Sequence, residues 1–135
     1  MIVNSFATLI NSKIVIPSSR SQYLAVDRYF LQFCLRGMIE KITLDEAWYL
    51  RTYPDVAAAI RTKDVASARE HYMLYGYFEN RLPYPIKIDE RWYIEQYPDI
   101  AEAVKREQYR SAQAHFEEVG FSEGRLPYPN FALSK

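Results

Sequence analysis

The chain has 135 residues, of which 49% are hydrophobic, so it is long enough and apolar enough for one folded domain with a buried core. Its seventeen basic and seventeen acidic side chains cancel, and this balance argues against a nucleic-acid partner or an anionic membrane surface. No secretory leader or apolar membrane span is recognisable, and the single cysteine, Cys34, excludes an intramolecular disulfide. We therefore expect a cytoplasmic protein with no membrane insertion.

The first 17 residues favour a β-hairpin over a helix. Two short runs rich in β-branched residues, 6–10 and 13–16, are separated by Asn11-Ser12, and Pro17 closes the second run. A lone hairpin is marginally stable in water, so we expect it to pack on the following helix or to pair with another chain through its edge.

Residues 22–40 predict one long hydrophobic helix, in which Gly37 is the weak position. Its polar residues form a narrow stripe at successive i+4 steps: Arg28, Gln32, Arg36 and Glu40. The apolar arc is wider than that of an ordinary surface helix. We therefore expect residues 1–41 to be the oligomerisation element of a homo-oligomer. The expected interface residues are Tyr23, Val26, Phe30, Phe33 and Met38.

The rest of the chain is an internal duplication. Residues 44–85 and 88–129 align without a gap at an offset of 44 residues, with 19 identities in 42 positions. The period suits helical solenoid repeats, but the expected helices are short and each copy contains a proline break, which argues against a HEAT or armadillo array. The predicted organisation is an N-terminal element at 1–41, repeats at 42–85 and 86–129, and a tail at 130–135, in one cooperative domain.

Each copy predicts three short helices. In the first copy, Thr43 or Asp45 caps a helix that runs to about Thr52. Pro54 ends this helix because a proline restrains the residue before it towards extended geometry, and the same proline suits the first turn of the next helix. The second helix is expected to stop near Lys63.

The third helix of the first copy is expected at about residues 65–75, with Gly76 as a left-handed C-cap. The prolines of residues 81–85 forbid a helix, so this tail should be extended. Asn80 and its equivalent Gly124 are the residue types that best tolerate a positive φ, which predicts another left-handed turn. The predicted fold class is mainly α: two tandem 44-residue repeats of three short helices, preceded by a β-hairpin and the long hydrophobic helix.

A spaced motif supports the division into repeats. The pattern W-Y-L-x-x-Y-P-D-V-A-x-A, E-H-Y-x-x-Y-G and E-x-R-x-P occupies residues 48–59, 70–76 and 79–83, and its second copy follows 44 residues later. It resembles a short tandem helical module of bacterial proteins, found beside calcium-binding repeat regions and in glycosyltransferase-associated polypeptides. The second copy departs from the pattern at Ala114 and Val119. The resemblance implies an accessory or interaction unit of a bacterial protein, without catalytic activity.

His71 and His115 are the two histidines, one in each copy. No second histidine or cysteine lies three or four residues away, so the spacing predicts no metal site. A histidine packed by its own helix and hydrogen-bonded to a carboxylate or carbonyl is the favoured interpretation, with ligand contact as the alternative. Cys34 lies in an apolar stretch and is expected to be inert.

Charged and aromatic residues at equivalent positions are the other candidates for ligand or partner contact. Asp55 with Arg81, and Asp99 with Arg125, could form an acid–cation pair in a pocket, although a helix-capping aspartate and an arginine that ties down the tail are favoured. A sugar-stacking platform is the alternative to a core role for five aromatic residues, which are Trp48, Tyr53, Tyr72, Trp92 and Tyr97.

The motifs that many enzymes carry are absent from the sequence. It lacks a glycine-rich phosphate loop, H-E-x-x-H, G-x-S-x-G and C-x-x-C. We therefore expect a non-catalytic protein–protein interaction module that binds no cofactor and associates with itself. Two alternatives remain open: an accessory glycan-binding domain, and a small enzyme or regulator that acts through His71 and His115.

Overall fold

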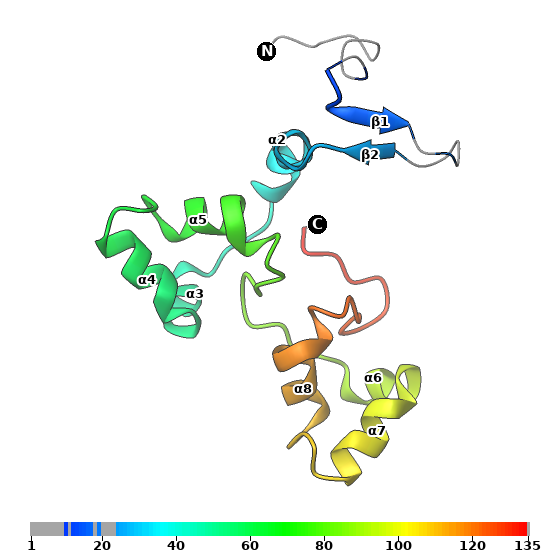
Figure 1. The fold of residues 1–135 in the computed structure, drawn as a ribbon. Helices are drawn as coiled ribbons and strands as arrows, with labels where there is room; N and C mark the ends of the chain where they lie inside the picture. The colour runs from blue at the N-terminus through cyan, green and yellow to red at the C-terminus, as the bar shows by residue number, and fades with distance from the viewer. Residues whose placement is uncertain (1–9, 11, 18, 20–23, 135) are drawn as a thin grey trace. The chain divides into compact units, whose positions relative to one another are not determined.

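The computed structural model describes residues 10, 12–17, 19 and 24–134. The chain divides into two compact units, Met1–Ile39 and Glu40–Lys135. The described part of the first unit contains a two-stranded antiparallel sheet and a helix, whereas the second unit is built from helices and turns (Figure 1). The fold is therefore mainly α with a small β-hairpin, which confirms the predicted class at this level. Within the described residues, no helix has the length and apolar character needed to cross a membrane.

The hairpin pairs strand β1 (Val15–Pro17) with strand β2 (Leu24–Val26). The strands are antiparallel, and Val15 lies opposite Val26. The pairing extends by one step beyond the strands, since Asp27 N donates to Ile14 O at 2.7 Å. β1 overlaps the second of the two predicted strands.

The predicted first strand, at 6–10, is wrong where it can be compared. Ile10 is helical, and its carbonyl oxygen accepts a hydrogen bond at 3.0 Å from Lys13 N. This bond closes a tight turn just before β1, so the chain there does not continue as a strand. Residues 6–9 lie outside the described residues. The partner of β1 is instead β2, a segment that the sequence had assigned to the long helix.

Helix α2 (Arg28–Ile39) has 12 residues, and the prediction of a long hydrophobic helix at 22–40 is wrong. Asp27 sets its start, because Asp27 Oδ1 accepts a hydrogen bond from Phe30 N at 3.0 Å and caps the first turn. The three residues before Asp27 pair with β1. Within α2, Ile39 is the residue whose side chain is buried, so most of the apolar arc of this helix is solvent-accessible.

The second unit contains one series of elements twice, at an offset of 44 residues. In the first copy (42–85) the series is α3 (Glu46–Thr52), α4 (Pro54–Arg61), α5 (Ala68–His71) and the π-helical turn η1 (Tyr72–Gly76). In the second copy (86–129) it is α6 (Glu90–Gln96), α7 (Pro98–Lys105), α8 (Ala112–His115) and η2 (Phe116–Gly120). Each series forms its own cluster of helices, and a non-helical segment connects the two (Figure 1).

Local sequence signals start the first two helices of each copy as predicted. Of the two expected caps, Thr43 and Asp45, the structure uses Asp45, whose Oδ1 accepts a hydrogen bond from Trp48 N at 2.9 Å. The equivalent bond in the second copy is 3.1 Å long. Pro54 occupies the first turn of α4, where an amide hydrogen would have no helical partner.

The third helix does not run from 65 to 75 as predicted. α5 gives way at Tyr72 to a π-helical turn, in which Tyr77 N donates to Tyr72 O at 2.9 Å. Gly76 ends this turn and is not among the residues with a positive φ, so its predicted role as a left-handed C-cap is wrong. Its lack of a side chain serves a close contact with Tyr49 instead.

Left-handed turns lie at two other positions in each copy. Asn80 has a φ of 57° and Gly124 a φ of 74°, which confirms the turn predicted there. A second pair, Lys63 (φ 64°) and Glu107 (φ 56°), follows α4 and α7 and was not predicted. A residue with a Cβ is strained in this region of conformational space, so these two turns cost folding energy.

The proline-rich tail of each copy folds back on the start of its first helix. Asp45 N donates to Pro83 O at 3.0 Å, and Asp89 N donates to Pro127 O at 2.9 Å. The tail of the first copy also enters the core of the second. The cluster of buried residues there consists of Leu82, Ile86, Ile88, Tyr93, Ile100, Ala112 and Phe116.

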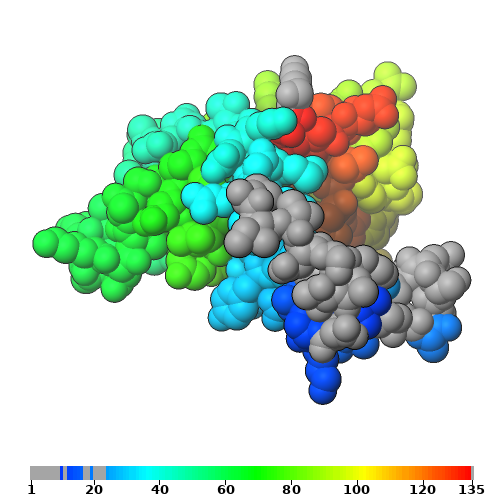
Figure 2. Space-filling view, turned by 90° about the horizontal axis from the view of Figure 1, so that it is seen from above, coloured from blue at the N-terminus to red at the C-terminus, as the bar shows by residue number. Residues whose placement is uncertain are grey.

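The C-terminal residues complete this core. Phe131 and Leu133 pack against the cluster, and the C-terminal segment, red in Figure 2, lies on the elements of the second copy. The two copies are therefore joined by shared apolar side chains as well as by the chain itself.

Replacement of Lys63 by glycine is expected to raise the free energy of unfolding, because glycine adopts a positive φ without strain. The gain should be up to about 1 kcal/mol, since the relief of strain is partly offset by the greater freedom of glycine in the unfolded chain. Lys63→Val should lower stability, because a β-branched side chain fits this region poorly. Urea unfolding followed by circular dichroism measures both changes, and equal stability of the two variants would contradict the strained turn.

Candidate functional site

A buried tyrosine–histidine pair lies inside each copy. Tyr49 on α3 and His71 on α5 are both buried, and the Tyr49 hydroxyl lies 3.1 Å from His71 Nδ1, within hydrogen-bonding distance. The second copy repeats the pair with Tyr93 and His115, also at 3.1 Å. Burial of these polar side chains is tolerated because each one satisfies the other.

A glycine borders each pair. A Cβ at Gly76 would overlap the Tyr49 hydroxyl, and a Cβ at Gly120 would overlap the Tyr93 hydroxyl and lie 3.2 Å from the His115 ring. The π-helical turns η1 and η2 end at these glycines and bring their backbone against the tyrosine. Any larger residue at either position would have to displace the hydrogen-bonded hydroxyl.

Burial favours the neutral form of both partners. It lowers the pKa of His71 below its usual value, and the positive charge of Arg81 lowers that pKa further. The pKa of His115 is lowered in the same way by burial and by Arg125. Burial also raises the pKa of Tyr93 to about 12 and raises the pKa of Tyr49. Each pair is therefore an uncharged hydrogen-bonded unit at neutral pH.

An arginine ties the tail of the first copy to α4. The Arg81 guanidinium forms a two-pronged pair with Asp55, with Nη1–Oδ1 at 3.0 Å and Nη2–Oδ2 at 2.8 Å. Arg81 Nε also donates to Glu79 Oε2 at 2.7 Å. The hydrogen bonds from Arg81 hold the pKa of Asp55 below its usual range. All three guanidinium nitrogens are thus engaged by carboxylates of the same copy.

Tyr53 completes the cluster around Arg81. The guanidinium carbon lies 4.9 Å from the centroid of the Tyr53 ring, and the Tyr53 hydroxyl accepts a hydrogen bond from Leu82 N at 2.9 Å. The second copy repeats these contacts. The Arg125 guanidinium carbon lies 4.9 Å from the centroid of the Tyr97 ring, and the Tyr97 hydroxyl accepts a hydrogen bond from Leu126 N at 2.9 Å. Arg125 also pairs with Asp99 and Glu123.

The structure thus gathers eight of the predicted contact residues into two equivalent clusters. The first cluster contains Tyr53, Asp55, His71 and Arg81, and the second contains Tyr97, Asp99, His115 and Arg125. We call them the arginine clusters.

The two tryptophans lie beside these clusters. Trp48 meets Tyr53 edge to face with 6.3 Å between ring centroids, and Trp92 meets Tyr97 at 6.2 Å. Both indoles are half-buried. Trp48 of the first copy packs against the cluster of buried residues in the core of the second copy. The guanidinium of Arg81 already lies over the Tyr53 ring, so that ring stacks on a group of the protein itself.

Four residues that complete the clusters were not among the predicted contact residues: Tyr49, Glu79, Tyr93 and Glu123. A signal for them was present, because each belongs to an identical pair at the offset of 44 residues. Their partners were not visible in the sequence, since Tyr49 and His71 are separated by 22 positions and Arg81 and Asp55 by 26.

Chemically, each arginine cluster is a closed network of satisfied groups. In the part of the chain that the structure describes, no group of three or more histidine, cysteine, aspartate or glutamate side chains is placed to hold a metal ion. Cys34 is an exposed free thiol on α2, outside both arginine clusters. The contacts described here fasten the tail of each copy to its helices.

Comparison with known proteins adds no assignment. No protein-family model, curated protein or solved structure matches this chain. The geometry of the described residues is therefore the basis for a functional proposal.

The variant Gly76→Ala is expected to lower the free energy of unfolding by about 1–3 kcal/mol, because the new Cβ displaces the Tyr49 hydroxyl. Tyr49→Phe should cost a similar amount, since it leaves His71 Nδ1 buried without its partner. The double variant should lose less than the sum, because the phenylalanine removes the atom that the alanine strikes.

Gly37→Ala is the matched control for this cycle. Apart from its chain neighbours and the backbone of its own helix, no atom of the described residues lies within 4 Å of a Cβ built at Gly37. It should not lower stability. Urea unfolding of the four variants gives the coupling energy, and strictly additive losses for Gly76→Ala and Tyr49→Phe would contradict the proposed contact.

Stability is expected to fall when the pH drops below about 6.5, the ordinary pKa of histidine. The folded chain holds both histidines neutral with lowered pKa values, so the unfolded chain binds more protons in this range and is favoured. The loss should continue until the pH reaches the lowered pKa values of the folded state.

Because the chain has two histidines, the double variant His71→Gln/His115→Gln isolates their contribution. Its urea midpoint should change less between pH 7.5 and pH 5 than that of the wild type, even if its stability is lower at both. An identical pH dependence for the two proteins would contradict the assignment to the buried histidines.

Proposed function

We propose that this protein is a non-catalytic interaction module that associates with itself through its N-terminal element, residues 1–41. The observation that carries the proposal is where exposed large hydrophobic side chains lie. Of eleven such side chains in the described residues, seven lie on the hairpin and α2: Ile16, Leu24, Val26, Tyr29, Leu31, Phe33 and Met38.

Several of these side chains expose more than half of their surface to solvent. Tyr29 is 80% exposed, Met38 66% and Phe33 57%. Burying apolar surface is worth about 25 cal/mol per Å², and a second copy offers the same apolar surface in return. We infer that these side chains form an interaction site together, since contiguous exposed apolar patches mark such sites.

The proposed interface keeps the residues expected from the sequence where the structure describes them. Val26, Phe33 and Met38 are exposed, and Phe30 is half-buried. Tyr23 lies outside the described residues. We add Tyr29, which is the most exposed of the large hydrophobic side chains on α2.

We assign the second unit the role of a rigid scaffold made of two copies of the bacterial tandem module. Closed arginine clusters support this role, because their charged groups pair with each other and offer no free charge to a substrate. The exposed free Cys34 and the resemblance to bacterial modules favour a bacterial cytoplasmic protein.

Light scattering on a sizing column tests the self-association directly. We expect the full-length wild type at high micromolar concentration to be a dimer or a larger oligomer. The variant Phe33→Glu/Met38→Glu should be a folded monomer, because two charges then lie in the apolar surface. Leu74→Glu is the control, since Leu74 is an exposed apolar residue of the second unit at 47%.

The control variant should keep the wild-type mass. A monomeric wild type would overturn the proposal, and so would a Phe33→Glu/Met38→Glu variant that keeps the oligomeric mass. Circular dichroism of each variant confirms that it is folded.

A further inference from the structure

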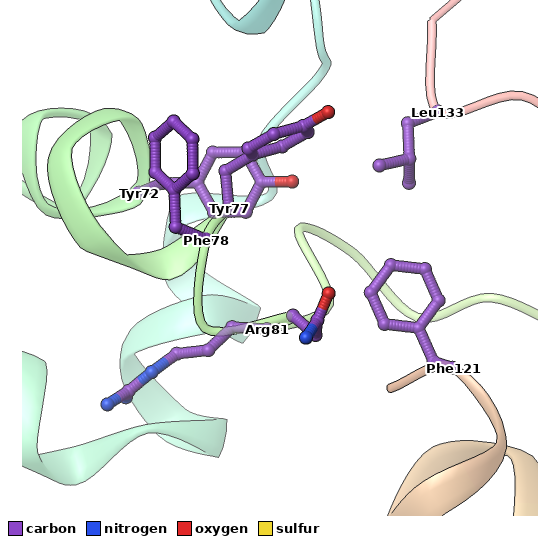
Figure 3. Close-up of a pocket in the computed structure, with 7 residues that line it drawn as sticks. Tyr72, Tyr77, Phe78, Arg81, Phe121 and Leu133 are labelled. Atoms are coloured by element: carbon purple, nitrogen blue, oxygen red, sulfur yellow. The ribbon is translucent and has the colours of Figure 1, made fainter. Parts of the chain in front are cut away.

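A pocket of about 310 Å³ lies within the second unit, between equivalent parts of the two copies (Figure 3). One side comes from η1 and the turn that follows it, with Tyr77 and Phe78. The opposite side comes from Phe121, which is the second-copy equivalent of Tyr77, and from Leu133 of the C-terminal segment. Its size is at the lower end of the range for small-molecule sites.

One polar group in this pocket lacks a partner. Tyr72 is fully buried, and its hydroxyl is the buried side-chain polar atom, among the described residues, that has no hydrogen-bond partner. Figure 3 shows this hydroxyl pointing into the space between Tyr77, Phe121 and Leu133. An unpaired buried hydroxyl costs about 1–3 kcal/mol, so its presence needs an explanation.

The second copy shows that packing does not require this hydroxyl. Its equivalent residue is Phe116, which is also fully buried and contacts Tyr93 just as Tyr72 contacts Tyr49, with ring centroids 6.0 and 5.8 Å apart. A phenylalanine therefore fills the position, and the hydroxyl of the first copy is an addition that faces the pocket.

The described residues that line the pocket present no free charge to an occupant. Arg81 contributes to its lining, but its guanidinium is paired with Asp55 and Glu79 and points away from Phe121 and Leu133 (Figure 3). Asn80 also belongs to the lining, and its side chain carries no charge. A charged ligand would lose its hydration here without gaining a counter-charge.

The walls favour a flat aromatic body. Tyr72 meets Tyr77 edge to face at 6.4 Å, and Tyr77 meets Phe78 edge to face at 5.1 Å. With Phe121 on the opposite side, aromatic rings line two sides of the space, and an aromatic ligand packs well against such surfaces.

We propose that this pocket binds a small neutral aromatic molecule with one hydrogen-bonding group, which pairs with the Tyr72 hydroxyl. Burial raises the pKa of Tyr72, which keeps its hydroxyl protonated and able to donate or accept. The site is independent of the self-association proposed above, since none of its lining residues belongs to the N-terminal element.

Indole and indene, an isosteric hydrocarbon without the N–H group, are the probes for this site. Titrations followed by two-dimensional NMR of the full-length protein give the affinity for each. The wild type should bind indole saturably, with shifts centred on Phe121 and Tyr77, and should bind indene about five- to tenfold more weakly, the effect of one hydrogen bond.

The variant Tyr72→Phe copies the residue of the second copy, so it should fold, and its unfolding midpoint should equal or exceed that of the wild type. It should bind indole about five- to tenfold more weakly and indene unchanged. Tyr75→Phe removes a hydroxyl from the same turn outside the pocket and should bind like the wild type.

Three outcomes would overturn the site. These are the absence of saturable indole binding, equal indole affinity for the wild type and Tyr72→Phe, and equal loss of indole affinity in Tyr75→Phe. Any of them would show that the Tyr72 hydroxyl does not pair with a ligand in this pocket. Phe121→Ala provides a second check, since it removes one wall and should abolish the binding of both probes.

Discussion

The hydrogen bond between a buried tyrosine and a buried histidine is the constraint on which each copy depends. It joins α3 to α5 in the first copy through Tyr49 and His71, two segments that are far apart in the chain. The hydroxyl needs space, which Gly76 provides, and Gly76 stands there because the helix widens into a π-helical turn. A break in the regular helix, a glycine and a polar pair in the core are thus parts of one arrangement.

The arginine clusters form a second layer of this arrangement. Arg81 fixes the proline-rich tail to α4. In the same tail, the carbonyl oxygen of Pro83 accepts a hydrogen bond from the start of α3, and the side chain of Leu82 packs in the core of the second copy. The charged and polar residues of the arginine clusters therefore hold the parts of each copy together. The two surfaces for which we propose partners are the exposed apolar side chains of the N-terminal element and the pocket at Tyr72.

Two substitutions between the copies have different consequences. Arg69 and its equivalent Gln113 have different side chains, yet both donate to a backbone carbonyl at the start of their copy, that of Ile42 at 2.8 Å and that of Ile86 at 2.9 Å. This change preserves a function. The difference between Tyr72 and Phe116 is of another kind. The Tyr72 hydroxyl has no partner among the described residues, and Phe116 has no hydroxyl. Duplication has therefore left one copy with a polar group that the other lacks.

The sequence by itself determined the duplication, the start of the first two helices in each copy and the left-handed turn at Asn80 and Gly124. These features follow from local chemistry: a capping aspartate, a proline in the first turn and a residue that tolerates a positive φ. Only the tertiary structure decided the role of Gly76, the partners of the histidines and the extent of α2. Each of these depends on a contact across many residues, such as the pairing of Leu24–Val26 with β1, and such a contact outweighs local propensity.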